Sequence, residues 1–131
     1  MRLTEVAEAL EAKVVCGCDA GDPEVTCVGA SDIVSDLLVW GKPGMLLLTG
    51  LAHPSVVRAA HLIDVAAVVF VRGRTPSEDA LALARDLALP VLLSPHSLYD
   101  CSGRLYVRGL PGVIPAQGEA ARTLGPTAQV D

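Results

Sequence analysis

The sequence predicts an α/β protein with a three-layer α/β/α arrangement around a small, mostly parallel central sheet. Short apolar runs of strand length alternate with segments whose apolar residues recur at helical spacing, a pattern typical of parallel strands joined by crossover helices. The chain has 131 residues, of which 51% are hydrophobic and 19% charged, enough for one continuous core. We therefore expect one folded domain over residues 1–110, followed by a flexible tail over 111–131.

The first third of the chain predicts one helix, two strands and a short connecting segment. The expected elements are a helix over 4–12, a strand over about 13–16, a strand over 25–30 and a short helix or turn over 33–40. Thr4 is placed to cap the first helix, because its hydroxyl can accept a hydrogen bond from the first turn. The glycine- and aspartate-rich stretch 17–23 predicts a turn, and Gly41-Lys42-Pro43-Gly44 predicts a clear break.

From residue 45 onward strands and helices alternate. The expected elements are strands over 45–48, 66–71 and 91–93, and helices over 54–63, 76–87 and 96–108. The strongest local signal is Thr75-Pro76-Ser77-Glu78, which combines a capping residue, Pro at the first helical position and Glu placed to bond back to the cap. Gly103 inside the last helix costs about 1 kcal/mol relative to alanine, which favours a close approach by another backbone, such as a partner subunit's.

Composition and charge exclude several partners. A net charge of -5 without clustered Lys and Arg opposes nucleic-acid binding. The longest apolar run, near residues 65–71, has strand length, so no membrane insertion is expected. Acidic residues stand where a signal peptide would have its apolar segment, so we expect a cytoplasmic protein. The surplus of apolar residues in so small a domain favours self-association, and we expect a homodimer.

Polar side chains gather at the carboxyl ends of the predicted strands, where open α/β sheets bind ligands. These residues are Ser31, Asp32, Thr49, Gly50, His53, Arg72, Gly73, Arg74, Ser94 and His96. In an acidic protein, arginines and histidines that converge near helix N-termini predict an anion site, suited to a nucleotide or another phosphate-bearing metabolite. The alternative is that these loops are simply polar, with Thr75 a helix cap and both arginines solvated.

Cysteine and nucleophile patterns give little support to other chemistry. Cys16, Cys18, Cys27 and Cys101 are expected to be free thiols in a reducing compartment. Cys16-x-Cys18 with Cys27 lacks the spacing of structural zinc sites, so we expect no metal, and no cofactor motif is present. No nucleophile elbow or phosphate-binding loop appears. A small enzyme of phosphate chemistry, using Arg72 or Arg74 with His53 or His96, remains the alternative to a non-catalytic domain.

Four ordered motifs resemble the DRTGG domain family over about residues 1–110. They are VGASDIVSD (28–36), LLTGLAHPSVVRAA (47–60), AVVFVRG (67–73) and SLYDCSGRLY (97–106). The resemblance implies an α/β domain akin to the N-terminal domain of HPr kinase, which also occurs beside CBS regulatory domains in some pyrophosphatases and in some phosphotransacetylases. There it is an accessory, often dimerising module, and catalysis resides in other domains.

One position departs from the family pattern. Thr49-Gly50 matches the characteristic turn, but the Asp-Arg pair associated with that turn in phosphotransacetylase-type members is replaced by Ala52-His53. A ligand site of those members therefore does not transfer directly to this chain. We expect a non-catalytic regulatory, ligand-sensing or assembly domain that contacts a small anion and a partner protein.

Overall fold

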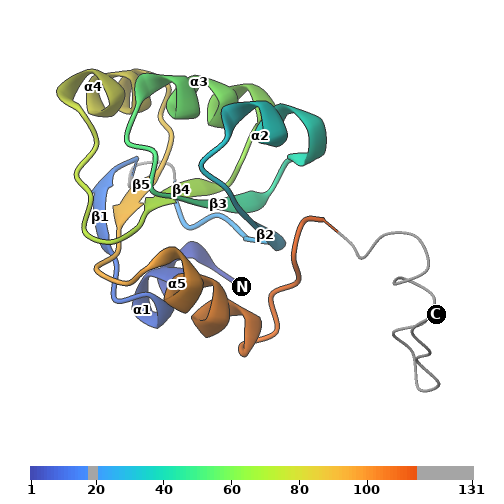
Figure 1. Cartoon of the computed structure of the whole chain (residues 1–131). Coiled ribbons are helices and arrows are strands. Elements are labelled where there is room, and N and C mark those ends of the chain that lie inside the picture. The colour runs from blue at the N-terminus through green and yellow to red at the C-terminus, as the bar shows by residue number, and fades with distance from the viewer. Residues whose placement is uncertain (18–20, 115–131) are drawn as a thin grey trace.

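A computed structural model describes residues 1–17 and 21–114 and shows the predicted three-layer α/β/α architecture (Figure 1). Its elements in chain order are α1 (Leu3–Ala9), β1 (Lys13–Cys16), β2 (Cys27–Ala30), α2 (Val34–Trp40), β3 (Met45–Thr49), α3 (Pro54–Ile63), β4 (Ala67–Phe70), α4 (Glu78–Asp86), β5 (Val91–Leu93) and α5 (Leu98–Tyr106). In the described part of the chain, no helix is long and apolar enough to cross a membrane.

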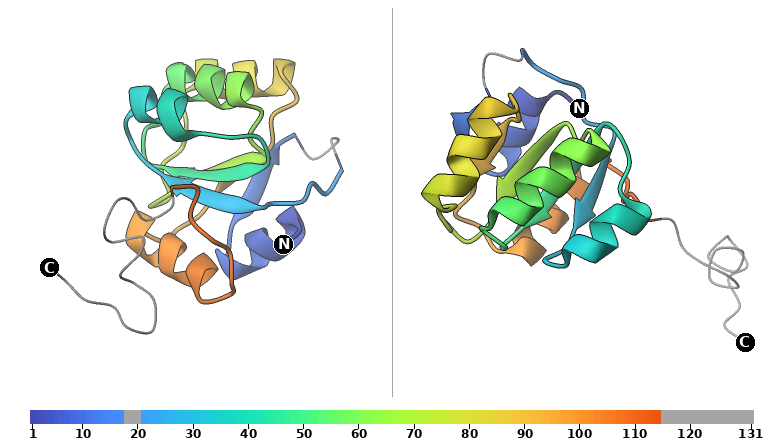
Figure 2. Two further views of the ribbon diagram at one scale, coloured as in Figure 1. Left: turned by 90° about the vertical axis from the view of Figure 1, so that its right-hand side faces the viewer. Right: turned by 90° about the horizontal axis from the view of Figure 1, so that it is seen from above.

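The central sheet has five strands in the order β1-β5-β4-β3-β2. Strands β2 to β5 are parallel and lie side by side in chain order, whereas β1 pairs with β5 in the antiparallel direction at one edge. Because crossovers between parallel strands are right-handed, a sheet that grows in one direction keeps its connecting helices on one face. Helices α2, α3 and α4 accordingly cover one face, and α1 and α5 cover the other (Figure 2).

Alternation along the buried strands divides the core between the two faces. In β3, Met45 and Leu47 pack in the cluster beneath α2, α3 and α4, whereas Leu46 and Leu48 pack in the cluster against α1 and α5. Every residue of β3 is buried, as expected for a central parallel strand covered on both sides. Because β2 to β5 are parallel, their carboxyl ends lie together at one edge of the sheet, and the predicted polar residues follow them there.

The first helix begins earlier than predicted and is capped by a different residue. Its N-cap is Arg2, not Thr4, and it ends at Ala9, three residues before the predicted end. The Asp22 carboxylate accepts hydrogen bonds from the backbone N–H of Thr4 (3.0 Å) and from its hydroxyl (2.9 Å). The Asp22 side chain, from the loop between β1 and β2, thus accepts hydrogen bonds from donors in the first turn. The local sequence around Thr4 does not reveal this arrangement.

Helix α4, by contrast, begins later than its motif predicts. Ser77, not Thr75, is the N-cap, and its hydroxyl accepts a hydrogen bond from Ala80 N at 3.2 Å. Pro76 lies outside the helix and is buried. The motif contains two potential caps, Thr75 and Ser77. Ser77 is selected because the helix that starts there has Ala80 and Ala84 fully buried in the core.

The folded part of the chain extends past the predicted boundary at residue 110. Val28 N donates to Pro111 O (2.9 Å), and Val113 N donates to Val28 O (2.8 Å), so residues 111–113 run along the free edge of β2. Val113 is buried against the core. The first residues of the predicted tail therefore belong to the domain, and they cover a strand edge that would otherwise expose unpaired backbone groups. Residues 115–131 of that predicted tail lie outside the described residues.

Candidate functional site at the carboxyl ends of the strands

Asp32 and Thr49 join the carboxyl ends of β2 and β3. Asp32 Oδ1 accepts hydrogen bonds from Thr49 Oγ1 (3.1 Å) and from Gly50 N (2.7 Å). Thr49 is fully buried, and its oxygen also accepts a hydrogen bond from Leu51 N at 3.1 Å. The Thr49-Gly50 turn is therefore held rigidly by a carboxylate from the neighbouring loop, which brings these three predicted site residues together.

Arg72 follows β4 in a left-handed conformation, with φ 60°. Such a conformation costs roughly 1–2 kcal/mol for a residue with a side chain. Two backbone bonds hold it there: Arg72 N donates to His96 O (2.7 Å) and Gly73 N donates to Ser94 O (2.8 Å). The loop after β4 is thus fastened to the loop after β5, and strained backbone of this kind concentrates at functional sites.

The Arg72 side chain crosses from β4 towards the turn after β3. A Cβ atom added at Gly50 would lie 2.9 Å from Nη2 of Arg72 and 3.6 Å from Oδ1 of Asp32. Gly50 is buried beneath these groups, and the absence of a side chain leaves room for the guanidinium. Within residues 1–17 and 21–114, this guanidinium takes part in no hydrogen bond or ion pair. Arg72 is exposed, so the N–H donors of its guanidinium are accessible to a ligand.

The remaining predicted residues on this side have local roles. His53 is the N-cap of α3, and its Nδ1 accepts a hydrogen bond from Ser55 N at 3.1 Å. Ser31 Oγ accepts a hydrogen bond from Ile33 N at 3.0 Å. Arg74 is exposed, and its backbone N–H closes a turn to Val71 O. Of these residues, only Arg74 adds a second positive charge without a partner in the described residues.

Ser94 is a buried residue that supports the fold and is not part of the surface. Its hydroxyl donates to Leu10 O (2.8 Å) and accepts from His96 N (3.2 Å) and from the thiol of Cys101 (3.4 Å). The side chain is fully buried, so it faces α1 and α5 instead of the solvent. Of the predicted site residues, Ser94 thus contributes by fixing the loop that holds Arg72.

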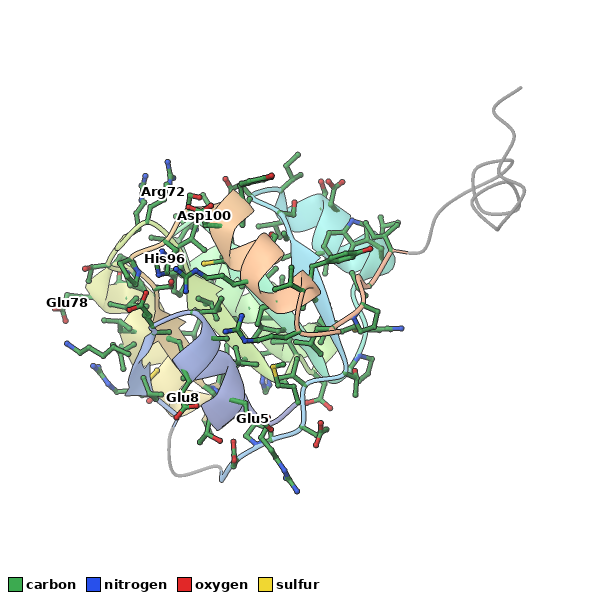
Figure 3. The ribbon with its side chains drawn as sticks, turned by 90° about the horizontal axis from the view of Figure 1, so that it is seen from below. Glu5, Glu8, Arg72, Glu78, His96 and Asp100 are labelled. Carbon is green, nitrogen blue, oxygen red and sulfur yellow. The ribbon has the colours of Figure 1, made fainter. Side chains whose placement is uncertain are left out.

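His96 belongs to a charged cluster on the α1 and α5 side of the same edge. His96 Nε2 lies 2.8 Å from Oε1 of Glu11, and Nη2 of Arg104 lies 3.7 Å from the same oxygen. The hydrogen bond from His96 is the main cause that lowers the pKa of Glu11, and the charges of His96 and Arg104 add to it. Figure 3 shows Arg72 and His96 at one end of the molecule, with Glu5 and Glu8 at the other.

Sequence reasoning missed Glu11 and Arg104, and no sequence signal marks them. Glu11 and His96 are separated by 85 positions in the chain, so only the packing of α1 beside α5 brings them together. Glu11 has a positive φ of 50° at the turn between α1 and β1. Non-glycine residues with such a φ are uncommon, but their identity cannot be read from composition or periodicity.

The cysteines have packing roles where the structure describes them. Cys27 and Cys101 are buried thiols, and burial raises the pKa of the Cys101 thiol. Cys16 is also buried, and its sulfur donates to Leu89 O at 3.6 Å. Cys18 lies outside the described residues. Among the described residues, no group of three or more His, Cys, Asp or Glu side chains is placed to hold a metal ion.

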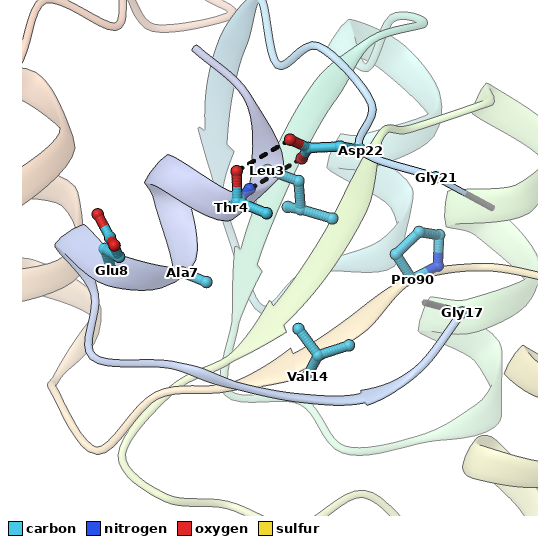
Figure 4. A pocket seen from close by; sticks show the side chains of 9 residues that line it. All are labelled: Leu3, Thr4, Ala7, Glu8, Val14, Gly17, Gly21, Asp22 and Pro90. Carbon is cyan, nitrogen blue, oxygen red and sulfur yellow. Dashed lines mark hydrogen bonds between the residues drawn. The ribbon is translucent and has the colours of Figure 1, made fainter. Parts of the chain in front are cut away.

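A cavity of about 400 Å³ lies at the opposite edge of the sheet (Figure 4). Its lining comes from α1, from β1 and the residue after it, from the loop before β2 and from the residue before β5: Leu3, Thr4, Ala7, Glu8, Val14, Gly17, Gly21, Asp22 and Pro90. No predicted site residue is part of this lining. The chain between Gly17 and Gly21 lies outside the described residues, and we propose no ligand for this cavity.

The fold and the site define a small α/β domain whose polar side chains gather at the carboxyl edge of parallel strands. A family model described as the DRTGG domain matches residues 5–106, and the chain belongs to this family. The chain is also similar to a solved structure of the CBS and DRTGG domains of the regulatory region of Clostridium perfringens pyrophosphatase, complexed with the activator diadenosine tetraphosphate. No curated protein matches the chain.

That similarity has a TM-score of 0.64 at 21% sequence identity. It covers 83% of this chain and 47% of the other, so this chain spans about half the length of the regulatory region. The shared part is the α/β fold itself. The prediction of a DRTGG domain with a mostly parallel sheet and flanking helices is thereby confirmed.

Proposed function

We propose that this protein is a non-catalytic regulatory domain that senses a phosphate-bearing anion, such as a nucleotide, at the carboxyl ends of its strands. It acts as a cytoplasmic homodimer and transmits ligand binding to a partner protein. The single observation that carries the proposal is the guanidinium of Arg72, which is held above Gly50 without an acidic partner in the described residues. Guanidinium groups match the oxygens of phosphate in charge and in geometry.

The backbone supports this role for Arg72. A left-handed residue with a long side chain destabilises the fold, and two hydrogen bonds to the next loop maintain it at this position. The Asp32 carboxylate is engaged by the Thr49-Gly50 turn, and so it stiffens the floor beneath the guanidinium. The fixed backbone at Arg72 and the rigid turn beneath its guanidinium need no reordering when a ligand arrives, which lowers the entropic cost of binding.

A regulatory role agrees with the relative of known structure. The Clostridium perfringens regulatory region binds an activator that contains phosphate groups, and it includes a DRTGG domain. We infer that the present chain likewise senses a metabolite on behalf of another domain or protein.

The positions of the histidines favour binding over catalysis. A phosphate-transfer enzyme would need a base or acid beside Arg72. His53 instead caps α3 through its Nδ1, and His96 is held by Glu11. We therefore assign no catalytic role to the Arg72 site.

The experiment is a thermal-shift screen with inorganic phosphate, AMP, ATP and diadenosine tetraphosphate, followed by titration calorimetry of any compound that stabilises the protein. Arg72→Ala should weaken binding about 10- to 100-fold, because a charge-assisted hydrogen bond is worth about 1.5–3 kcal/mol. Arg85→Ala is the matched control: Arg85 is also exposed, but it lies in the last turn of α4, at the opposite end of that helix from the site. Equal affinities of both variants, or no stabilisation by any of the four compounds, would refute the proposal.

A further inference from the structure

Helix α5 has two apolar faces, of which only one packs against the rest of the described chain. Cys101 and Leu105 are fully buried against the sheet. On the opposite face Tyr99 is 85% exposed, Tyr106 76% and Val107 78%. Large apolar side chains that line up on one exposed face mark an interaction surface more often than isolated ones do.

Gly103 lies in the middle of this exposed face. With 3.6 residues per turn, positions 99, 103, 106 and 107 fall along one stripe of the helix. A Cβ atom added at Gly103 would meet no atom within 4 Å, so nothing in the described chain requires a glycine here. The prediction that Gly103 permits a close backbone contact is therefore not met inside the protomer, and the space in front of it is open.

Charges of both signs flank the stripe on one side. Asp100, Arg104 and Arg108 line a shallow groove of about 440 Å³ together with Tyr99, Gly103 and Val107. Asp100 is in the first turn of α5 and Arg104 in the last, so the acidic group precedes the basic groups along the helix. A helix with this order of charges is complementary to a second copy of itself that runs in the opposite direction.

We propose that the exposed face of α5 is the homodimer interface, formed by antiparallel packing of α5 against the same helix of a second copy. The inference rests on the assembly part of the proposed function and assigns it to a surface. A twofold axis near Gly103 places Tyr99 opposite the partner's Val107, and it brings the two Gly103 backbones together. The same symmetry keeps the charged flanks on one side, where Asp100 reaches Arg108 of the partner subunit, while Arg104 stays with Glu11 and Ala9 O of its own protomer.

The interface is isologous, because each copy supplies the same stripe and the same flank. Its centre is aromatic and aliphatic with a small residue at the crossing point, and its rim is charged. This is the usual anatomy of a protein interface. The N-terminus of α5 follows His96, whose carbonyl oxygen accepts from Arg72 N. The proposed dimer surface and the proposed ligand site are thus connected through one short loop.

Sedimentation equilibrium of the full chain between about 1 and 500 μM tests the proposal. The wild type should dimerise, and Val107→Ser should weaken the dimer at least tenfold. Leu62→Ser is the matched control, since Leu62 is 76% exposed but lies on α3 in the opposite helical layer. Circular dichroism establishes that both variants remain folded. A strictly monomeric wild type, or a dimer that responds to Leu62→Ser and not to Val107→Ser, would overturn the inference.

A charge-exchange experiment tests the antiparallel register. Asp100→Arg alone and Arg108→Asp alone each place like charges opposite one another and should weaken the dimer. An equimolar mixture of these two variants restores both ion pairs and should form a heterodimer of near wild-type affinity. Two singly substituted variants that dimerise as well as the wild type would refute the arrangement.

Phosphate-compound titration of Val107→Ser separates this inference from the proposed function. If the variant is monomeric and still binds through Arg72, both stand. If dimerisation does not involve α5 while Arg72→Ala abolishes binding, the interface is wrong and the ligand site stands.

Discussion

Replacing Ser94 by alanine tests whether this residue supports the fold or contacts ligand. Its hydroxyl donates to the buried Leu10 carbonyl and accepts from His96 N, and Ser94→Ala leaves both groups without these bonds. Leaving a buried polar group unsatisfied costs about 1–3 kcal/mol, so we expect the free energy of unfolding to fall by about 2–3 kcal/mol. For a domain of this size that corresponds to a decrease in Tm of about 10 °C.

Urea denaturation and thermal unfolding of Ser94→Ala and Ser102→Ala provide the measurement. The Ser102 hydroxyl donates to Leu98 O, one turn earlier in its own helix, so its loss should change stability by less than about 0.5 kcal/mol. At temperatures below its unfolding transition, Ser94→Ala should retain wild-type affinity for phosphate compounds, because the buried hydroxyl touches no ligand. Equal stability of the two variants would refute the structural role, and lost affinity in a folded Ser94→Ala protein would restore Ser94 to the ligand site.

Further outcomes concern packing, helix propensity and pH. Gly29→Ala should destabilise by about 1–3 kcal/mol in urea unfolding, because its Cβ would lie 2.5 Å from Cζ3 of Trp40; unchanged stability would contradict this packing. Gly103→Ala, in a monomeric background, should stabilise by about 0.5–1 kcal/mol, and a loss of stability would show that Gly103 is needed within the protomer. The pKa of Glu11 is lowered in the folded state, chiefly by the hydrogen bond from His96, so its contribution is present above the unfolded pKa of about 4.3 and is lost as the pH falls through the folded value. Unfolding measured from pH 7 to pH 3 should therefore show a shallower acid decline for Glu11→Gln than for the wild type, and parallel curves would contradict the role of Glu11.

Local sequence patterns predicted those helices and strands whose positions are also favoured by packing in the core. The apolar run at 45–48 had to be a central strand, because such a run can be buried only with cover on both faces. Prediction failed at Thr4 and Thr75, where a plausible local cap was overruled. In the first case Asp22 supplied the bonds from another loop, and in the second the burial of Ala80 selected Ser77.

The candidate site shows the same division. Asp32, Gly50 and Arg72 were predicted to converge, because parallel strands present their carboxyl ends at one edge, and they do. Ser94 and His96 were predicted by the same rule, but their side chains turn towards α1 and α5. Position along a strand determines which edge a residue reaches, but the direction of its side chain there depends on what packs beside it.

The sequence by itself determined the α/β class, the order of helices and strands, and the edge of the sheet that carries the polar residues. These follow from periodicity and capping, which act over a few neighbouring residues. Only the tertiary structure decided that Arg72 stands above Gly50, that Glu11 holds His96, and that one face of α5 is exposed in the described part of the chain. Those contacts join residues far apart in the chain, and their geometry arises from the packing of whole elements against one another.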